Sequence, residues 1–463
     1  MTSATIQRPP LRHRPRLMRE LLNTPERALD ELATYGPVCA LGSGPLRMAI
    51  IGSPALVREL LLLPNDRFRY DVPLSPFPTV VGKASMLASD GTDHHRRRSA
   101  VAGSLSRRNL ERWIPMIVER TDATVDAVLA ASTSPAEAGD GIVDLYPAGR
   151  WLVLDIVVRA LFGAHLIDRL DEIDELQRSG HDFLTSPLWR QRSLMPSGRR
   201  VRALAHRDRA AFDALIDEAI GVARSSDDPD PPDVLARLVQ ERALDDAEIR
   251  DQVKTLIGAG YDTTASTLAW TLWEATLRPG LWTELRAEAD RHLGVAGDAD
   301  EAVLAGLAQA GATVREALRL HPASGIAVRT TAVDLTIGGH PIRRGTLAVW
   351  SPYLAGRDPA TWSEPTRFDP SRFLAADGDT EPDFESSEQV RRAAAHEAWL
   401  PFGRGARMCV GFALAQMELT LIVARIAQRL DLVPTAPLPP EPRGLVVSAP
   451  ATGAPMYVRP RAV

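Results

Sequence analysis

Long stretches of helical periodicity, with few strand-like runs between them, most constrain how this chain can fold. Apolar residues recur at helix spacing in six segments: 109–131, 152–162, 202–223, 245–277, 281–293 and 302–320. Strand-like runs are short and gather at 38–51 and 327–350, where Gly338-Gly339 predicts a hairpin turn, with a further pair near 445–458. Because strands do not alternate with helices, the pattern argues against a Rossmann or barrel fold. We expect a mainly α fold with a minor β portion.

The composition is that of an ordinary soluble globular protein. The 463 residues are 45% apolar and 24% charged, with a formal net charge of −5, which gives no electrostatic reason to expect a nucleic acid as partner. No run of about 18 or more apolar residues occurs, so we expect no membrane span. Residues 1–25 form a basic, proline-rich arm without the apolar core of a signal peptide. Two cysteines fit a reducing compartment, and we expect a cytoplasmic location.

One of the two cysteines lies in an unusual setting. The residues at 402–411 read Phe-Gly-Arg-Gly-Ala-Arg-Met-Cys-Val-Gly, and a helix of small and apolar residues is predicted to follow directly. Cys39, the other cysteine, lies in an apolar run typical of a strand, so no disulfide partner or four-cysteine zinc site is indicated. A thiol near a helix N-terminus is shifted toward thiolate. Cys409 is therefore either a nucleophile, an iron ligand or a structural core residue.

The predicted helix at 245–277 has an unusual centre, Gly-Ala-Gly-Tyr-Asp-Thr-Thr at 258–264. Glycine inside a helix costs about 0.5–1 kcal/mol relative to alanine, which makes sense where another group approaches the backbone. The Thr263 hydroxyl is placed to donate to the Ala259 carbonyl one turn earlier. Asp262 brings an acid into an apolar helix, so it either points to water or has a task. Close packing of helices at small residues is the alternative explanation.

Two further patterns come later in the chain. Glu316 and Arg319 share a helical face and can form an ion pair, although such pairs are common on surface helices. Arg372, in Phe-Asp-Pro-Ser-Arg-Phe at 368–373, could join them. A buried carboxylate tolerates desolvation when two guanidiniums surround it, so we interpret the three residues as one structural set.

The patterns follow one another in a fixed order. They are Gly-x-Asp-Thr at 260–263, Glu-x-x-Arg at 316–319, Pro-x-Arg-Phe at 370–373, and Phe-x-x-Gly-x-Arg-x-Cys-x-Gly at 402–411, which Ala415 and Glu418 extend. In this combination the chain resembles the cytochromes P450, haem-thiolate monooxygenases, of the soluble bacterial type, over residues 30–460. The resemblance implies a triangular prism of helices around a buried haem, in a single haem domain at 26–463 that follows the arm at 1–25.

The resemblance also implies how the haem b would be held. Cys409 would be the axial thiolate ligand of the iron, a ligand that favours cleavage of the O–O bond. Phe402 would pack beside the sulfur, and Gly411 would let the following helix approach the porphyrin. The helix backbone at Ala259 and Gly260 would also approach the haem. Four residues would bind the propionates: His94, Arg98, Arg329 and Arg407. The adjacent His95 and Arg97 leave the register of the first pair open by one residue.

On the other side of the haem, Asp262 and Thr263 would form an acid–alcohol pair that delivers protons to bound O2. Thr263 would hold the oxygen and a water, and Asp262 would connect to solvent. The three residues of the Glu316 set would be structural rather than catalytic. The chain departs from the family pattern at Gly356, where a histidine is common, and at Leu105, where an aromatic is common. Nothing in the sequence explains Tyr261.

The resemblance indicates a hydrophobic, medium-sized substrate. The candidate pocket residues are Phe77, Leu74, Val80, Phe183, Leu188, Trp189 and Ile326. About 30 residues follow the predicted cysteine helix, too few for a flavin or iron–sulfur domain. Electrons from NAD(P)H are therefore expected to come through a separate ferredoxin or flavodoxin with its reductase. A basic docking patch for that partner could include Arg96, Arg97, Arg107 and Arg404. We expect a monomer.

Several functions remain open at this level. The leading prediction is a monooxygenase that hydroxylates or epoxidises a small molecule in natural-product tailoring, with a terpene, polyketide or steroid-like substrate. An alternative is fatty-acid oxidation or a peroxide-dependent haem-thiolate reaction, and another is an isomerase-type relative that needs no electrons. A non-catalytic haem sensor or binding protein is the alternative from a different class, and a helical protein without haem is the least favoured.

Overall fold

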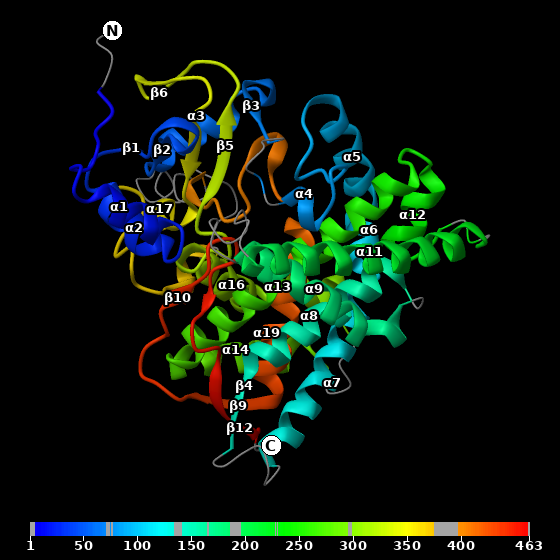
Figure 1. Ribbon diagram of the computed structural model, residues 1–463. Coiled ribbons are helices and arrows are strands. Elements are labelled where there is room, and N and C mark those ends of the chain that lie inside the picture. Colours follow the sequence, from blue (N-terminus) through cyan, green and yellow to red (C-terminus); the bar gives the residue numbers. More distant parts are fainter. Residues whose placement is uncertain are drawn as a thin grey trace, which may run out of the picture. The chain divides into compact units, whose positions relative to one another are not determined.

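The computed structural model describes residues 5–70, 75, 77–133, 141–163, 166–185, 196–226, 228, 230–294, 299–374 and 397–461 (Figure 1). This part of the chain divides into two compact units, each assembled from separate stretches of sequence. The first unit comprises Met1–Val72, Ala312–Cys409 and Glu441–Ala449, and the second comprises Pro73–Gly311, Val410–Pro440 and Pro450–Val463. No helix in the described ranges is both long and apolar enough to cross a membrane.

The first unit is built around a five-stranded sheet in the order β1-β2-β8-β5-β3. Only the β2–β8 pair within it is parallel. Its strands are β1 (Val38–Leu41), β2 (Met48–Ile51), β3 (Phe68–Arg69), β5 (Ala327–Thr331) and β8 (Leu347–Trp350), with β6 (Leu335–Ile337), β7 (His340–Ile342) and β10 (Pro442–Arg443) outside it. Its helices are α1 (Arg14–Leu21), α2 (Pro25–Ala33), α3 (Pro54–Leu62) and α17 (Pro352–Ala355), with 3₁₀ turns η1 (Gly44–Leu46), η2 (Asn65–Arg67), η4 (Pro370–Phe373) and η5 (Gly405–Arg407).

Alternating side chains of this sheet fill two apolar cores. Cys39 and Ile50 pack with Leu17 of α1 on one side, whereas Val38 and Ile51 pack with α3 on the other. Cys39 is thus an ordinary core residue, as predicted, and burial raises the pKa of its thiol to about 11. The hairpin predicted at Gly338-Gly339 is also present. Both glycines have positive φ, 54° and 78°, as a two-residue turn between β6 and β7 requires.

The second unit is a bundle of helices around α13 (Asp246–Thr276), which Figure 1 shows beside α8 and α19. Its other helices are α4 (Phe77–Val80), α5 (Gly91–Ser104), α6 (Arg107–Glu111), α7 (Ile114–Thr133), α8 (Leu145–Phe162), α9 (Leu170–Thr185), α11 (Pro196–Arg224), α12 (Val234–Glu241), α14 (Pro279–His292), α15 (Glu301–Gly306) and α19 (Phe412–Arg429), with the 3₁₀ turn η3 (Ile167–Arg169). Helix α16 (Ala308–Leu320) starts in this unit and ends in the first, and the short strand β11 (Ala449–Pro450) lies at another boundary.

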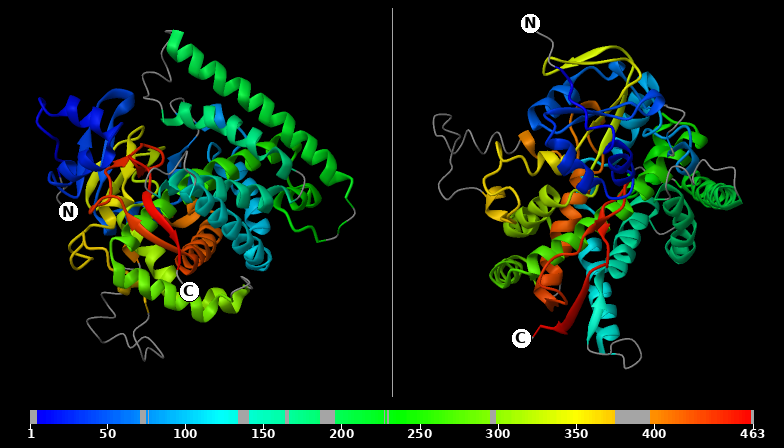
Figure 2. Two further views of the ribbon diagram at one scale, coloured as in Figure 1. Left: turned by 90° about the horizontal axis from the view of Figure 1, so that it is seen from below. Right: turned by 60° about the vertical axis from the view of Figure 1, so that its left-hand side comes forward.

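Helix α13 begins where the sequence predicted a helix start. Asp245 accepts a hydrogen bond from the Glu248 backbone, and the Glu248 side chain accepts one from the Asp245 backbone, which forms a capping box. Most of its residues are buried, since α8, α14 and α19 pack against it. The long α11 lies against α9 (Figure 2). A three-stranded sheet of β4 (Ile142–Asp144), β12 (Pro455–Pro460) and β9 (Leu430–Pro434) completes the unit.

Candidate active site

The cysteine loop presents its thiol at the surface of the first unit. Cys409 is exposed, and its backbone N–H donates to the Phe402 carbonyl over 2.9 Å. Gly405 has φ +75°, and a Cβ there would lie 2.7 Å from the Leu61 carbonyl oxygen, so only glycine fits. Helix α19 begins at Phe412 with Gly411 as its N-cap. Cys409 therefore precedes the cap by two residues, and the loop, rather than the first helical turn, sets its orientation.

Aromatic rings connect this loop to the Glu316 set. The ring of Phe402 lies 5.7 Å from that of Trp399, which lies 6.0 Å from Phe373. Phe373 lies 6.0 Å from Trp362, whose face is covered by the Arg319 guanidinium at 5.1 Å. Edge-on and tilted rings at these distances attract one another. The prediction that Phe402 packs beside the sulfur stays a prediction, while the structure shows what holds the Phe402 ring.

The Glu316 set forms as the sequence predicted. Arg319 donates to both carboxylate oxygens of Glu316 over 2.7 Å, and both side chains are fully buried. Arg372 approaches the same carboxylate with its Nε 3.4 Å from Oε1, as an ion pair. Remaining Arg319 protons go to backbone carbonyls, which include Gly356 and Pro365. A buried ion pair survives desolvation when its hydrogen-bonding capacity is satisfied in this way.

The structure also explains the departure at Gly356. A Cβ at this position would lie 2.2 Å from the Arg319 carbonyl oxygen, which no side chain tolerates without a backbone shift. Glycine at this point therefore lets residues 356–357 pack directly on the end of α16. The departure concerns packing around Arg319 rather than chemistry.

Two of the predicted propionate ligands meet in the first unit around a tyrosine. The Arg407 guanidinium stacks on the Tyr70 ring at 3.8 Å, and that of Arg329 lies 6.0 Å from the same ring. Arg329 is 5% exposed, and burial lowers the pKa of its guanidinium. Tyr70 was not predicted, because it lies outside every motif and no pattern in the sequence marks it.

In the second unit, the centre of α13 has an open stretch within a mostly buried helix. Ala259 is exposed, and Gly258, Gly260 and Thr263 are partly exposed, whereas nearly all residues around them are buried. The Thr263 hydroxyl donates to the Ala259 carbonyl over 2.6 Å, as predicted. Small residues at this opening leave the backbone accessible to a flat group.

Asp262, which the resemblance expects to connect to solvent, is buried and paired with an arginine, and its connection to solvent stays a prediction. It is 6% exposed, and Arg150 of α8 donates to its Oδ1 from Nε over 3.2 Å, with Nη2 at 3.1 Å. The reason is electrostatic, because a carboxylate in an apolar helix bundle needs a countercharge. A residue 112 positions away supplies it, and no sequence pattern joins the two.

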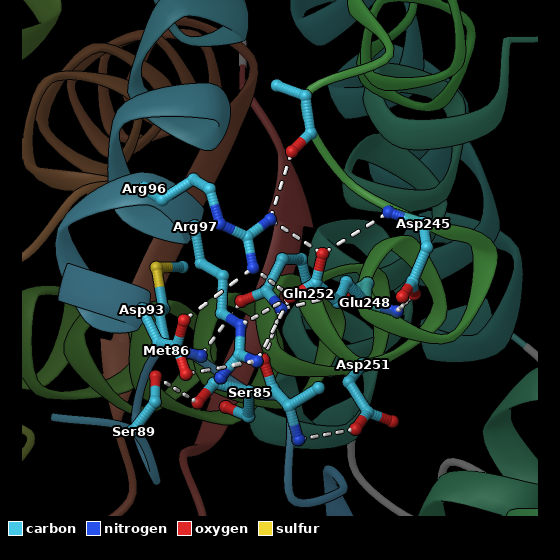
Figure 3. Close-up of polar contacts among 12 residues, drawn as sticks. Ser85, Met86, Ser89, Asp93, Arg96, Arg97, Asp245, Glu248, Asp251 and Gln252 are labelled. Atoms are coloured by element: carbon cyan, nitrogen blue, oxygen red, sulfur yellow. Dashed lines mark hydrogen bonds and ion pairs between the residues drawn. The ribbon is translucent and has the colours of Figure 1, made fainter.

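A polar cluster bears on the histidine–arginine register left open on α5, and Figure 3 shows its Arg96, Arg97 and Glu248. Arg96 and Arg97 both bind Glu248 at the start of α13, and these contacts, Arg96 first, lower the pKa of Glu248 to about 2. His94 is buried and His95 is exposed. Geometry thus favours His94 and Arg98 for a ligand. The same contacts weaken the docking-patch hypothesis, because Arg96 and Arg97 are engaged within the fold, and Arg107 pairs with Glu111.

The adjoining residues of α13 hold the segment before α5 (Figure 3). Asp251 accepts from the Ala84 backbone over 2.8 Å. Gln252 accepts from the Met86 backbone over 2.8 Å and donates to the Ala84 carbonyl over 2.6 Å. These bonds fix the entry to α5, and hence His94, to the helix that carries Thr263.

The predicted pocket residues are only partly described. Phe77 and Val80 belong to α4, and a Cβ on Gly180 of α9 would lie 2.8 Å from Val80, so α4 and α9 touch there. Phe183 is buried in α9. Ile326 packs against an apolar core of the first unit. Leu74, Leu188 and Trp189 lie outside the described residues.

The residues present fit a haem by the chemistry of their donors. The first unit offers an exposed thiol and two guanidiniums near one phenol. The Phe68 and Tyr70 rings face the Arg329 guanidinium, and in the described ranges no carboxylate contributes to its pKa shift. A propionate would supply the missing negative charge. The second unit offers the open stretch of α13 and a buried histidine.

Comparisons with known proteins agree with these features. A cytochrome P450 family model matches residues 22–454. Cytochrome P450 139 of Mycobacterium tuberculosis (strain ATCC 25618 / H37Rv) is 33% identical over 376 residues, which cover 79% of this chain and 81% of that protein. Cyclooctat-9-en-7-ol 5-monooxygenase of Streptomyces melanosporofaciens is 30% identical over 427 residues, 89% of this chain and 86% of that protein.

A solved structure supports the same fold. The crystal structure of the cytochrome P450DA heme domain superimposes with a TM-score of 0.83 at 22% identity, and the match covers 100% of this chain and 98% of that one. The mainly helical fold with minor sheets is therefore confirmed. The chain belongs to the cytochrome P450 family and is a monooxygenase of that family.

Proposed function

We propose that this P450 binds haem b through Cys409 and uses O2 with two external electrons to oxidise a hydrophobic small molecule. The overall reaction balances as RH + O2 + 2e⁻ + 2H⁺ → ROH + H2O, or as the epoxide when a C=C bond reacts. The observation that carries the proposal is the exposed Cys409 thiol in a loop fixed by glycines and by the bond to Phe402. A thiolate ligand on haem iron favours O–O cleavage.

Two cysteine variants test the ligand. The dithionite-reduced wild type with CO should show the strongly red-shifted Soret band of thiolate ligation. Cys409→Ser should lose this band. The matched control, Cys39→Ser, removes a thiol buried in the core and should keep it. Retention of the band by haem-loaded Cys409→Ser would contradict the proposal.

We propose that His94, Arg98, Arg329 and Arg407 bind the propionates. Support comes from the burial of His94, the engagement of Arg97 by Glu248 and the finding that no carboxylate among the described residues contributes to the pKa shift of Arg329. Arg329→Met should weaken haem retention, measured as transfer to excess apomyoglobin, because a buried anion would lose a charge-assisted bond. Transfer at the wild-type rate would remove Arg329 from the set.

Asp262 and Thr263 are proposed as the proton-delivery pair. Thr263 lies at the open stretch of α13, and Asp262 is the adjacent acid, paired with Arg150. Thr263→Ala should release more H2O2 per NADPH consumed. An unchanged ratio would contradict the role of Thr263, and would favour a reaction that takes peroxide or needs no electrons.

The proposed substrate is a hydrophobic terpene-like hydrocarbon or alcohol, which would place the enzyme in secondary metabolism. The support is the relative named for oxidation of cyclooctat-9-en-7-ol, together with apolar candidates such as Phe77, Val80 and Phe183. Titration of the haem spin state with a panel of terpenes, steroids, polyketides and fatty acids tests this. A shift with fatty acids alone would contradict it.

The electrons are proposed to come from NAD(P)H through a ferredoxin or flavodoxin and its reductase, with a monomeric, cytoplasmic, single haem domain at 26–463 as the acceptor. Stopped-flow reduction by each carrier, at low and high salt, tests the partner. A rate that does not change with salt would contradict electrostatic docking.

A further inference from the structure

Tyr261, the residue that the sequence left unexplained, has two contacts in the structure. Its ring lies under the Arg150 guanidinium, whose central carbon is 4.8 Å from the ring centroid. Its hydroxyl donates to Asp174 Oδ1 of α9 over 2.6 Å. The ring and the hydroxyl thus join two helices, α8 and α9, to the centre of α13. Tyr261 is 3% exposed, so both contacts are made inside the fold.

The Arg150 guanidinium makes the connection from Tyr261 to Asp262. It binds the Asp262 carboxylate at 3.1 Å while its face rests on the ring of the preceding residue. A planar guanidinium can do both at once, because its donors lie in the plane and its faces stack. The ring therefore limits where Arg150 can lie, and Arg150 limits where the Asp262 carboxylate can point.

We propose that Tyr261 and Arg150 are positioning residues for Asp262, and that the Tyr261–Asp174 hydrogen bond makes this positioning depend on helix α9. The proposal rests on the proton-delivery role given to Asp262 above. The chain of contacts runs Asp174–Tyr261–Arg150–Asp262, and each link is a contact between neighbouring helices or residues. A displacement of α9 would release the Tyr261 hydroxyl first and free the Arg150 guanidinium next.

Other titratable and charged groups border this series of contacts. Tyr146, one turn before Arg150 on α8, has its pKa raised to about 12, by burial first and by Asp262 next. Arg178 of α9 binds Asp174 over 2.8 Å. Arg178 is mostly exposed, so Asp174 keeps a solvent-screened partner when the Tyr261 bond is lost. In this series of contacts, the buried part therefore consists of the side chains of Tyr261, Arg150 and Asp262.

Asp174 offers the sharpest test, because it contacts neither Asp262 nor a haem-binding candidate in the contacts described. Asp174→Ala removes the acceptor for Tyr261, whereas Asp174→Asn keeps a carbonyl oxygen that can accept the same hydrogen bond. Asp174→Ala should speed amide exchange across α9 about tenfold. Asp174→Asn should stay near the wild-type exchange rate. This readout does not depend on catalysis.

The catalytic readout is the solvent deuterium isotope effect on NADPH-driven O2 consumption, without added substrate and with a saturating ferredoxin and reductase. Asp262→Asn should slow consumption and raise the isotope effect. Asp174→Ala and Tyr261→Phe should move both in the same direction, with rates about threefold lower. Asp174→Asn should restore the wild-type values. The amount of correctly ligated protein is normalised by the CO difference band.

The chain provides a matched control. In the first unit the Arg357 guanidinium stacks on the Tyr353 ring at 3.9 Å, and the Tyr353 hydroxyl donates to Asp30 over 3.1 Å. Tyr353→Phe therefore removes a phenol hydroxyl from the same kind of arginine–tyrosine–aspartate set. This set belongs to the first unit, whereas Asp262 belongs to the second. Its isotope effect should equal that of the wild type.

Two outcomes separate this proposal from the function it rests on. If Asp262→Asn changes the isotope effect while Asp174→Ala, Tyr261→Phe and Arg150→Leu do not, the positioning chain is overturned and the role of Asp262 stands. If Asp262→Asn itself changes nothing, the proton-delivery role fails and the positioning proposal fails with it.

Discussion

Replacement of Glu418 by glutamine should change how the stability of the protein depends on pH. Glu418 lies on α19 and is 1% exposed, and among the described residues its Oε1 has no hydrogen-bond partner. Burial raises the pKa of this carboxyl from 4.5 to about 8. The folded protein therefore keeps Glu418 protonated at neutral pH, when the unfolded chain has already released the proton.

The direction in which stability changes with pH follows from the number of protons that the folded and unfolded states bind. Below pH 4.5 both states are protonated and Glu418 contributes no pH dependence. Between pH 4.5 and 8 the unfolded state binds fewer protons than the folded state, so stability falls as pH rises. At about 1.4 kcal/mol per pH unit, the loss between pH 6 and pH 8 is roughly 2 kcal/mol. With an unfolding entropy of about 1 kcal/mol/K for a chain of this length, Tm should fall by about 2 °C.

The assay compares Tm at pH 6 and pH 8, followed by far-ultraviolet circular dichroism at a fixed heating rate. The fall in Tm should be about 2 °C smaller for Glu418→Gln than for the wild type, whatever the absolute cost of the buried amide. Glu119→Gln, at a glutamate that is 71% exposed on α7, serves as control and should keep the wild-type slope.

Infrared spectroscopy gives an independent measurement. The wild type at pH 7 should show a protonated-carboxyl C=O band that Glu418→Gln lacks. Equal Tm slopes for the two proteins, with no such band lost, would refute the reasoning that burial keeps Glu418 neutral.

Three further substitutions, the first with a matched control, test the packing around the site. Gly82→Ala places a Cβ 2.0 Å from Asp251 at φ +92° and should lower the free energy of unfolding by about 2–3 kcal/mol. The control Gly36→Ala, at φ +122° with open space around it, introduces the backbone strain alone. Equal losses of unfolding free energy in the two variants would contradict the steric argument. Glu248→Gln removes the charge shared by Arg96 and Arg97 and should speed amide exchange in α5, and unchanged exchange would show that the cluster of Figure 3 does not hold that helix. Glu316→Gln leaves the buried Arg319 without its countercharge and should cost about 3–5 kcal/mol in urea unfolding, and a loss below 1 kcal/mol would contradict it.

Helices with a strong local signal were predictable from the sequence. The segment predicted at 245–277 is found as α13, Asp246–Thr276, because a capping box marks its start and apolar residues continue to its end. The segment predicted at 302–320 is instead two helices, α15 and α16, which break at Leu307. Periodicity alone does not reveal such a break.

Helices α5 and α9 were missed, for different reasons. The inward face of α5 consists of His94, Ala100, Val101 and Ser104, so no apolar stripe marks it as a helix. In α9, Leu170, Ile173 and Leu176 do recur at helix spacing, so an apolar stripe was present and was not used, while Asp174 beside it serves a long-range contact with Tyr261. Tertiary contacts, rather than helix propensity, explain why polar residues such as His94 and Asp174 occur in these two helices.

The contacts of the candidate site also fall into local ones, which were predictable, and long-range ones, which were not. Groups within one motif, such as Thr263 and Ala259 or Glu316 and Arg319, were predictable because helix geometry fixes their spacing. Partners from distant segments were not, since nothing local joins Arg150 to Asp262 or Tyr70 to Arg407. The sequence therefore indicates candidate side chains for the chemistry, but not the neighbours that would orient them.

The hydrogen bond from Thr263 to the Ala259 carbonyl has a consequence for the proton delivery proposed above. A hydroxyl carries a single hydrogen, and in this structure that hydrogen is directed at a backbone oxygen of the helix. In this rotamer Thr263 can only accept, so a water beside it must point a hydrogen toward the threonine. To donate elsewhere, the side chain must rotate and leave the Ala259 carbonyl to another donor. In the proton-delivery role proposed for Thr263, the alcohol would have two positions, and the direction of its hydrogen bonds would reverse between them.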